Sequence, residues 1–189
     1  MKVVPANAER WADIETLFSE KGGYAGCWCM FWRLPRKEFK QKKGAGTKRE
    51  HKKQLAQGTV TGVIGYVDGH PVGWCSVGPR QAYAALEDSR ILKRVDDTPV
   101  WAVVCYFVAK PYRKQNAMLR LLEGAVAYAR KQGAVAVEGY PLDMDSPQLS
   151  GQKLNTYAGY MGIASVYKKL GFKQVGRASE TQLIMRLML

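Results

Sequence analysis

The feature that most constrains the fold of this chain is an apolar run near its centre, VWAVVCYFVA, residues 100–109. The run is half as long as the roughly 20 residues that a membrane-spanning helix needs, and β-branched and aromatic side chains dominate it. It therefore predicts a buried β-strand. From Met118 onward, apolar residues recur at helical spacing until Gly133, and the apolar segment AVAVEGY follows directly. This order predicts a strand–helix–strand unit whose two strands run parallel.

The first half of the chain alternates between predicted helices and short strands. Asn7 is the expected N-cap of a helix over residues 8–19, which carries an apolar stripe. The segment CWCMFWR, residues 27–33, predicts a short strand, or a turn followed by a strand, that ends at Pro35. Two β-rich segments, GVIGYV and PVGWCSV, flank an Asp-Gly turn at residues 68–69 and predict an antiparallel hairpin. A short helical stretch, AYAALEDSR, precedes the central run.

After the parallel unit, the sequence predicts one more helix and two closing strands. A polar excursion over residues 143–159 leads to this helix, which Gly171 ends, and the strands follow near KQVGRA and QLIMRLML. We therefore expect one mixed α/β domain over residues 1–189, with a central sheet of about six to seven strands flanked by helices. The apolar positions of the last helix are Ile163, Val166, Tyr167 and Leu170.

The chain is strongly basic, and much of the excess charge is local. Its net charge is +13 at pH 7, and residues 33–53 contain ten lysines and arginines against two glutamates, a surplus of eight. This segment is expected to be helical with a break at residues 44–46. The charge indicates either a solvated basic face or, alternatively, a patch that binds nucleic acid or an acidic protein.

Cysteine and histidine usage gives no sign of a disulfide scaffold or a metal site. The chain has four cysteines and two histidines, and His51 and His70 stand apart, so we expect free thiols and no bound metal. The N-terminus turns polar before an export signal could form, which predicts a cytoplasmic protein without a membrane segment. The cysteines are Cys27, Cys29, Cys75 and Cys105.

The loop between the central strand and its helix, FVAKPYRKQNAM, has the properties of an anion-binding site. Backbone N–H groups at a helix start have no intrahelical partner, and they point along the positive end of the helix dipole. Arg113 and Lys114 add positive charge beside them. A pyrophosphate is the group that this arrangement predicts.

With this loop, the sequence resembles the GNAT acetyltransferases, whose coenzyme A loop has Val, then Arg or Gln five residues later, then two small residues at fixed spacing. Val108 and Arg113 hold that spacing, and VYKKLGF, residues 166–172, is similar to the second signature of the family. The segments PVGWCSVGPR and EGYP look like a bacterial branch of this superfamily. The resemblance implies a coenzyme A cleft after the central strand, with loop contacts from Arg113, Lys114, Gln115, Asn116, Ala117 and Met118.

The loop departs from the family pattern at its two small positions, which are Asn116 and Met118 here. Asparagine tolerates a left-handed backbone better than other non-glycine residues, so Asn116 is expected to keep the turn. A methionine at the second position is expected to push the cofactor away or to change the path of the loop.

The resemblance also implies a chemical role for several residues. Backbone N–H groups near Phe107 and Val108 would bind the thioester and the pantetheine arm, and Tyr167 would protonate the leaving thiolate. The alternative for Tyr167 is an ordinary core tyrosine, because it lies on the apolar face of its helix.

The residues themselves suggest a base and other substrate contacts. Glu138 interrupts an otherwise apolar strand, which makes it the candidate general base, or else the partner of an internal arginine. Tyr140 and Asp143 are alternative substrate contacts at the same strand end. No histidine stands near Cys105 in sequence to activate it, so we expect its thiol to pack in the sheet.

Together these features predict an N-acetyltransferase that uses acetyl-coenzyme A and transfers the acetyl group by direct attack of a primary amine. The sequence contains no motif that identifies the amine, which would be a small molecule or a peptide. The alternative is a catalytically weak relative that binds coenzyme A, or a nucleic acid or acidic partner through residues 33–53. A homodimer is compatible with either hypothesis.

Overall fold

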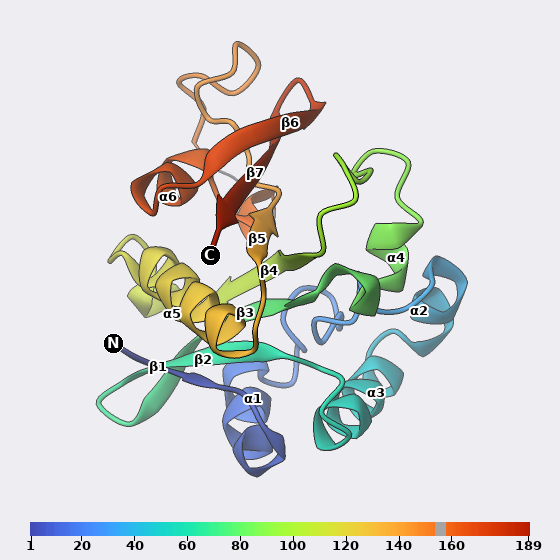
Figure 1. The fold of residues 1–189 in the computed structure, drawn as a ribbon. Helices are drawn as coiled ribbons and strands as arrows, with labels where there is room; N and C mark the ends of the chain where they lie inside the picture. Colours follow the sequence, from blue (N-terminus) through green and yellow to red (C-terminus); the bar gives the residue numbers. More distant parts are fainter. Residues whose placement is uncertain (154–157) are drawn as a thin grey trace.

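In a computed structural model, which describes residues 1–153 and 158–189, these residues form one mixed sheet flanked by helices (Figure 1). The seven strands of this sheet follow the order β1-β2-β3-β4-β5-β7-β6. No helix in the described ranges is long and apolar enough to cross a membrane. The strands are β1 Lys2–Pro5, β2 Gly62–Val67, β3 His70–Pro79, β4 Val100–Val108, β5 Ala136–Gly139, β6 Lys173–Ser179 and β7 Gln182–Met188.

Helices connect these strands and cover both faces of the sheet. The α-helices are α1 Trp11–Phe18, α2 Arg36–Lys42, α3 Ala45–Ala56, α4 Ala84–Glu87, α5 Ala117–Lys131 and α6 Ala164–Lys169. Four short 3-10 helices are η1 Ala8–Arg10, η2 Arg80–Ala82, η3 Lys110–Tyr112 and η4 Ala158–Met161.

The predicted strand–helix–strand unit is confirmed: β4 and β5 pair in parallel, and α5 connects them. The hairpin is confirmed as well, because β2 and β3 pair antiparallel around Asp68 and Gly69. Both turn residues have positive φ angles, 49° and 78°, as a tight two-residue hairpin turn requires. The expected break in the basic helical segment falls at Gly44, where φ is 92°.

Two cores form on opposite faces of β3, since successive strand residues point to opposite sides. Cys75 and Val77 pack under α5 with Leu121 and Leu122. Trp74 points the other way, into an aromatic cluster with residues of α1 and α3. In Figure 1, α5 and α1 accordingly lie on opposite sides of the sheet.

The N-terminal part differs from the sequence prediction in two places. Residues 27–33 form turns instead of a strand, because Trp28 and Cys29 have left-handed φ angles of 43° and 57° that an extended strand excludes. These side chains are nevertheless buried in the aromatic cluster. The edge position beside β2 is taken by β1, a strand that the sequence did not reveal.

The first helix also differs from expectation at its start. Asn7 precedes the 3-10 turn η1 and makes no side-chain capping hydrogen bond, so the α-helix begins at Trp11. Its apolar stripe is buried as predicted.

Candidate functional site

The site lies where β5 separates from β4. The two strands pair only over residues 100–103 and 136–139, whereas β4 continues to Val108. Just beyond the paired part, β4 carries one extra residue, Val104, because Val103 faces Val77 and Cys105 faces Ser76. Such a bulge bends a strand locally. Within the described residues, β4 therefore has no strand partner on its β5 side after the bulge.

Among the described residues, this arrangement leaves the backbone N–H of Val108, but not that of Phe107, without a strand partner. The N–H of Ala109 donates to the carbonyl oxygen of Val72 on β3 at 2.9 Å. Backbone groups of successive strand residues point to alternate sides, so Val108 directs its N–H and C=O to the side that β5 leaves open. The same alternation turns the Phe107 N–H toward β3 and the Tyr106 N–H toward the open side. Of Phe107 and Val108, the two residues that the resemblance implied, Val108 faces the open side, as does Tyr106, which the sequence did not indicate. The role of these amides in binding stays a prediction.

The predicted anion-binding loop joins this strand end to α5. Asn116 has φ 59° and ψ 13°, so asparagine supports the left-handed turn as expected, and Lys114 also has a positive φ of 63°. Asn116 makes no side-chain capping hydrogen bond. In the described chain, no backbone carbonyl accepts a hydrogen bond from the N–H of Ala117 or Met118. The first turn of α5 therefore keeps donors for an anion, and its residues fit a diphosphate.

The side chains of the loop have distinct environments. Arg113 donates from Nε to the carbonyl oxygen of Val108 at 2.8 Å, so it braces the loop against the strand end. Gln115 donates from Nε2 to the carbonyl oxygen of Pro111 at 2.8 Å. Gln115 and Lys114 are both exposed. Met118 is partly buried, and its Sδ lies 3.6 Å from the position that a Cβ would occupy at Gly162. The expected effect of Met118 on the cofactor stays a prediction.

Tyr167 lies against the end of β5 and is fully buried. Its hydroxyl donates to the carbonyl oxygen of Met161 at 3.2 Å and accepts a hydrogen bond from the Tyr106 hydroxyl at 3.1 Å. A Cβ at Gly139 would lie 2.6 Å from both Cζ and Oη of the tyrosine, so only glycine fits beneath the ring. Burial raises the pKa of Tyr167. Tyr167 is thus a core residue whose hydroxyl meets the free part of β4.

Glu138 is an ion-paired carboxylate on the other face of β5. It accepts hydrogen bonds from Arg186 at 2.7 and 3.0 Å, and its second oxygen lies 3.0 Å from the Tyr140 hydroxyl and 3.5 Å from Arg80. All four groups are buried. The neighbouring Gly139 faces Tyr167, so Glu138 and Tyr167 lie on opposite sides of the strand. This geometry matches the alternative of an internal arginine partner, and the role of Glu138 as a base remains untested.

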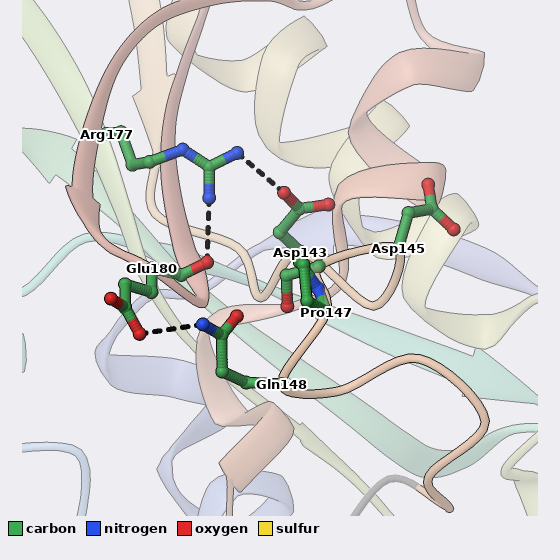
Figure 2. A pocket seen from close by; sticks show the side chains of 7 residues that line it. Asp143, Asp145, Pro147, Gln148, Arg177 and Glu180 are labelled. Carbon is green, nitrogen blue, oxygen red and sulfur yellow. Dashed lines mark hydrogen bonds and ion pairs between the residues drawn. The ribbon is translucent and has the colours of Figure 1, made fainter.

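The two alternative substrate contacts lie apart from each other. Tyr140 receives a hydrogen bond from Arg80 at 2.6 Å and is buried. Asp143 lines a surface hollow of about 380 Å³ beside the β6–β7 turn, where Arg177 holds its carboxylate at 2.8 Å (Figure 2). Residues 154–157 of the predicted excursion lie outside the described residues. The remaining lining residues of the hollow are Asp145, Ser146, Pro147, Gln148 and Glu180.

The cysteines lie inside the fold without disulfides. Cys105 packs against the aromatic cluster on the face opposite α5, as expected. Cys29 accepts a hydrogen bond from the Trp74 indole at 3.1 Å, and a hydrogen bond from Cys105 is the main cause that lowers its pKa to about 7. No group of three metal-ligating side chains occurs in the part of the chain that the structure describes.

Comparison with known proteins gives the same fold. The model of the family described as "Acetyltransferase (GNAT) family" matches residues 28–144, which is more than half of the chain. No curated protein gives a significant match to the sequence.

Several solved structures match over nearly their whole length. Aminoglycoside 6'-acetyltransferase type Ii is 13% identical, with 100% of this chain and 97% of that chain covered and a TM-score of 0.56. The ribosomal-protein-S5-alanine acetyltransferase from Vibrio fischeri is 14% identical, with 98% and 91% covered and a TM-score of 0.55. The PaiA N-acetyltransferase from Thermoplasma acidophilum, solved in complex with coenzyme A, is 13% identical, with 100% of both chains covered and a TM-score of 0.53. At such identities, these similarities show the fold alone.

Proposed function

The chain belongs to the GNAT acetyltransferase family, and on that premise we propose that it transfers an acetyl group from acetyl-coenzyme A to a primary amine by direct attack. One observation carries the proposal. The open edge of β4 at Val108 leads through a left-handed turn at Asn116 into a helix start that no side chain caps. This combination offers an amide for the pantetheine arm and a set of donors for the diphosphate next to each other.

In this proposal the first turn of α5 binds the diphosphate through its backbone N–H groups. Hydrogen bonds to charged acceptors contribute about 1.5–3 kcal/mol each, so two or three of them account for a cofactor affinity in the usual range. Arg113 contributes by holding the strand end and the loop together, and Lys114 adds a mobile positive charge. The cosubstrate supplies an acetyl group already activated as a thioester.

Tyr167 is the proton donor in this proposal. Burial keeps its hydroxyl protonated, as a general acid requires, and the hydroxyl lies where β4 and β5 part. Its proton points to the Met161 carbonyl in the resting protein, so this hydrogen bond must be exchanged for one to the leaving sulfur.

Glu138 has a structural part in the same proposal. Its carboxylate stays between Arg80 and Arg186, and the amine attacks in its neutral form after losing its proton to water. Removing one partner from a buried ion pair leaves uncompensated charge, so the contacts of Glu138 favour a structural part.

The acceptor class is proposed at the level of an amine. The names of two similar structures refer to an aminoglycoside and to the alanine of a ribosomal protein, so both small-molecule and protein acceptors occur with this fold. We extend to this chain only the primary amine that such acceptors share. A homodimer and a cytoplasmic location remain predictions.

A second role, binding of an anionic partner, is supported by the surface of α2 and α3. Glu38 and Glu50 are the acidic residues of this segment, and both pair with Lys42. Arg33 is buried, and Lys48 pairs with Glu15. The other basic side chains of the segment are exposed and form no ion pair within the described part of the chain: Arg36, Lys37, Lys40, Lys43, Arg49, Lys52 and Lys53.

Thermal unfolding with and without acetyl-coenzyme A tests the enzymatic proposal directly. A ligand at 100 times its dissociation constant stabilises the folded state by about 2.7 kcal/mol, which gives a clear shift of the melting temperature. Release of free thiol in the presence of a panel of primary amines then measures turnover. The absence of a shift at millimolar ligand, together with salt-sensitive retention on nucleic acid, would instead favour the second role.

A charge reversal locates the cofactor. Lys114→Glu puts a carboxylate beside the proposed diphosphate site, and we expect about a tenfold weaker binding of acetyl-coenzyme A, equivalent to about 1.4 kcal/mol. Lys131→Glu is the matched control, because Lys131 is equally exposed but lies at the far end of α5, about 20 Å away. Equal affinity losses in both variants, measured by calorimetry, would show that the diphosphate does not bind at the helix start.

A further inference from the structure

Two buried phenols meet on the α5 side of β4. Tyr106 belongs to the part of β4 that β5 leaves free, and Tyr167 belongs to α6. Their rings are edge to face, with centroids 6.4 Å apart, and their hydroxyl oxygens are 3.1 Å apart. The exposed fractions are 6% for Tyr106 and 0% for Tyr167, so water does not compete for this contact.

The direction of the hydrogen bond between them follows from proton counting. A phenol carries one proton, and a carbonyl oxygen can only accept. Tyr167 uses its proton on the carbonyl oxygen of Met161 at 3.2 Å. The proton between the two phenols must therefore come from Tyr106, which makes Tyr167 the acceptor.

This direction matters when Tyr167 loses its proton. A phenolate in a buried site is costly, and burial is the main cause that raises the pKa of Tyr167. The hydrogen bond from Tyr106 acts against burial and lowers that pKa, because it stabilises the charged form. Tyr106 itself keeps its proton, since burial raises its own pKa well above the usual range. The donor is thus already in place before the charge forms.

We propose that Tyr106 is a positioning residue for the proton transfer, holding the Tyr167 oxygen and stabilising the phenolate that Tyr167 becomes. This inference rests on the proposed function of Tyr167 as the acid. In the transfer, the O–H bond of Tyr167 breaks, the proton goes to the leaving sulfur, and the electron pair stays on Tyr167 Oη. The C–N bond forms and the C–S bond breaks, and the acetylated nitrogen then loses its extra proton to water. A proton from water restores the phenol, and the proton that the amine lost before the attack stays in solvent, so protons balance over one turnover.

The described groups that contact the two tyrosines are uncharged. The groups that face the two hydroxyls are the thiol of Cys75 on β3 and the Met161 carbonyl oxygen at the end of η4, while Gly139 of β5 and Phe172 pack against the Tyr167 ring. Burial raises the pKa of Cys75, so it is a neutral neighbour. Of these groups, Tyr106 is the hydroxyl that donates to Tyr167.

The test is a double-mutant cycle with Tyr106→Phe and Tyr167→Phe, each of which removes one oxygen atom and keeps the ring. We expect Tyr106→Phe to lower kcat about tenfold with KM for acetyl-coenzyme A unchanged, because the hydrogen bond strengthens only as charge develops. In the Tyr167→Phe background the same change should have no further effect on kcat. Tyr128→Phe is the matched control, since Tyr128 of α5 packs on Trp101 of β4, away from both hydroxyls.

A binding measurement gives a readout that does not depend on turnover. Calorimetry with coenzyme A and with desulfo-coenzyme A measures the contact to the sulfur, and we expect the preference for coenzyme A to fall about threefold in Tyr106→Phe and in Tyr167→Phe alike. The melting temperature of each variant controls for loss of folding.

The outcomes distinguish a failure of the role of Tyr106 from a failure of the proposed function of Tyr167. If Tyr167→Phe lowers kcat and Tyr106→Phe does not, this inference is overturned while the proposed function stands. If Tyr106→Phe lowers kcat equally in both backgrounds, its effect is structural and the inference is overturned as well. If Tyr167→Phe leaves kcat unchanged, the acid assignment fails, and the role of Tyr106 fails with it.

Discussion

Substituting Gly139 by alanine tests whether Tyr167 occupies the position that the structure gives it. The new Cβ would lie 2.6 Å from both Cζ and Oη of Tyr167, and closer still to Cε1, while ordinary contacts begin at 3.4 Å. Cζ and Oη must therefore move by about 0.8 Å and Cε1 by more, or the strand must shift. Because Tyr167 is packed between Gly139, Gly162 and Phe172, neither movement is free.

Two magnitudes follow from this clash. Overpacking of a dense core costs about 1–3 kcal/mol, and we expect a loss of that size in the free energy of unfolding by denaturant. A displacement of about 1 Å in a reacting group lowers turnover about 100-fold, and we expect kcat to fall on that scale. KM for acetyl-coenzyme A should change little, since the first turn of α5 does not touch Gly139.

Two controls isolate the contact. Gly176→Ala places a Cβ 3.3 Å from the end of Val95, a neighbour that can yield, so its stability change should stay within about 0.5 kcal/mol. In a Tyr167→Leu background, where the ring is absent, Gly139→Ala should lose most of its effect. If Gly139→Ala folds with unchanged stability and unchanged turnover, then the tyrosine does not lie against β5 and the assignment of the acid has no structural basis.

Two further substitutions probe charges in the core. His51 is fully buried, and burial lowers its pKa from 6.5 to about 3. Between these two pH values the unfolded state binds a proton that the folded state does not. The contribution of His51 to stability is therefore complete above pH 6.5 and is lost as the pH falls toward 3. We expect His51→Phe to remove about 1.4 kcal/mol per pH unit from the slope of the unfolding free energy in that window, and an unchanged slope would show that His51 is accessible to protons. Glu138→Gln leaves Arg80 and Arg186 without their shared carboxylate, so it should destabilise the fold by about 3–5 kcal/mol. The control is Glu123→Gln, which removes a surface ion pair with Arg120 and should cost less than about 1 kcal/mol. A mild loss at Glu138, with a shifted pH profile of kcat, would restore it as a candidate base.

Local sequence patterns predicted the elements that form the proposed cofactor site. The apolar run of β4, the periodic face of α5 and the spacing from Val108 to Arg113 are all short-range features, and each lies where expected. The left-handed turn at Asn116 was also predictable, because few non-glycine residues tolerate that conformation.

The errors come from features that sequence patterns do not encode. Trp28 and Cys29 adopt left-handed angles that their residue types do not favour, so an aromatic segment that is typical of a strand forms turns instead. The strand β1 is four residues long and stands at an edge, where hydrophobic alternation is too short to recognise.

The site predicted from the sequence lacked several residues, because their contacts join distant parts of the chain. The partners of Glu138, Arg80 and Arg186, are 58 and 48 residues away, and Tyr106 meets Tyr167 across 61 residues. Contacts at such separations are set by the register of the sheet and the position of the bulge, and neither can be read from one sequence without an alignment.

Only a short strand pairing joins the two halves of the sheet in the described residues. Strands β1–β4 and β5–β7 are connected by four residue pairs of β4 and β5, and on one face Glu138 links Arg80 of the first half to Arg186 of the second. We therefore expect the angle between β4 and β5 to depend on this buried ion-pair network. Arg186 also pairs with Asp96 in the segment before β4, so we expect a change in that surface segment to alter the separation of the two strands.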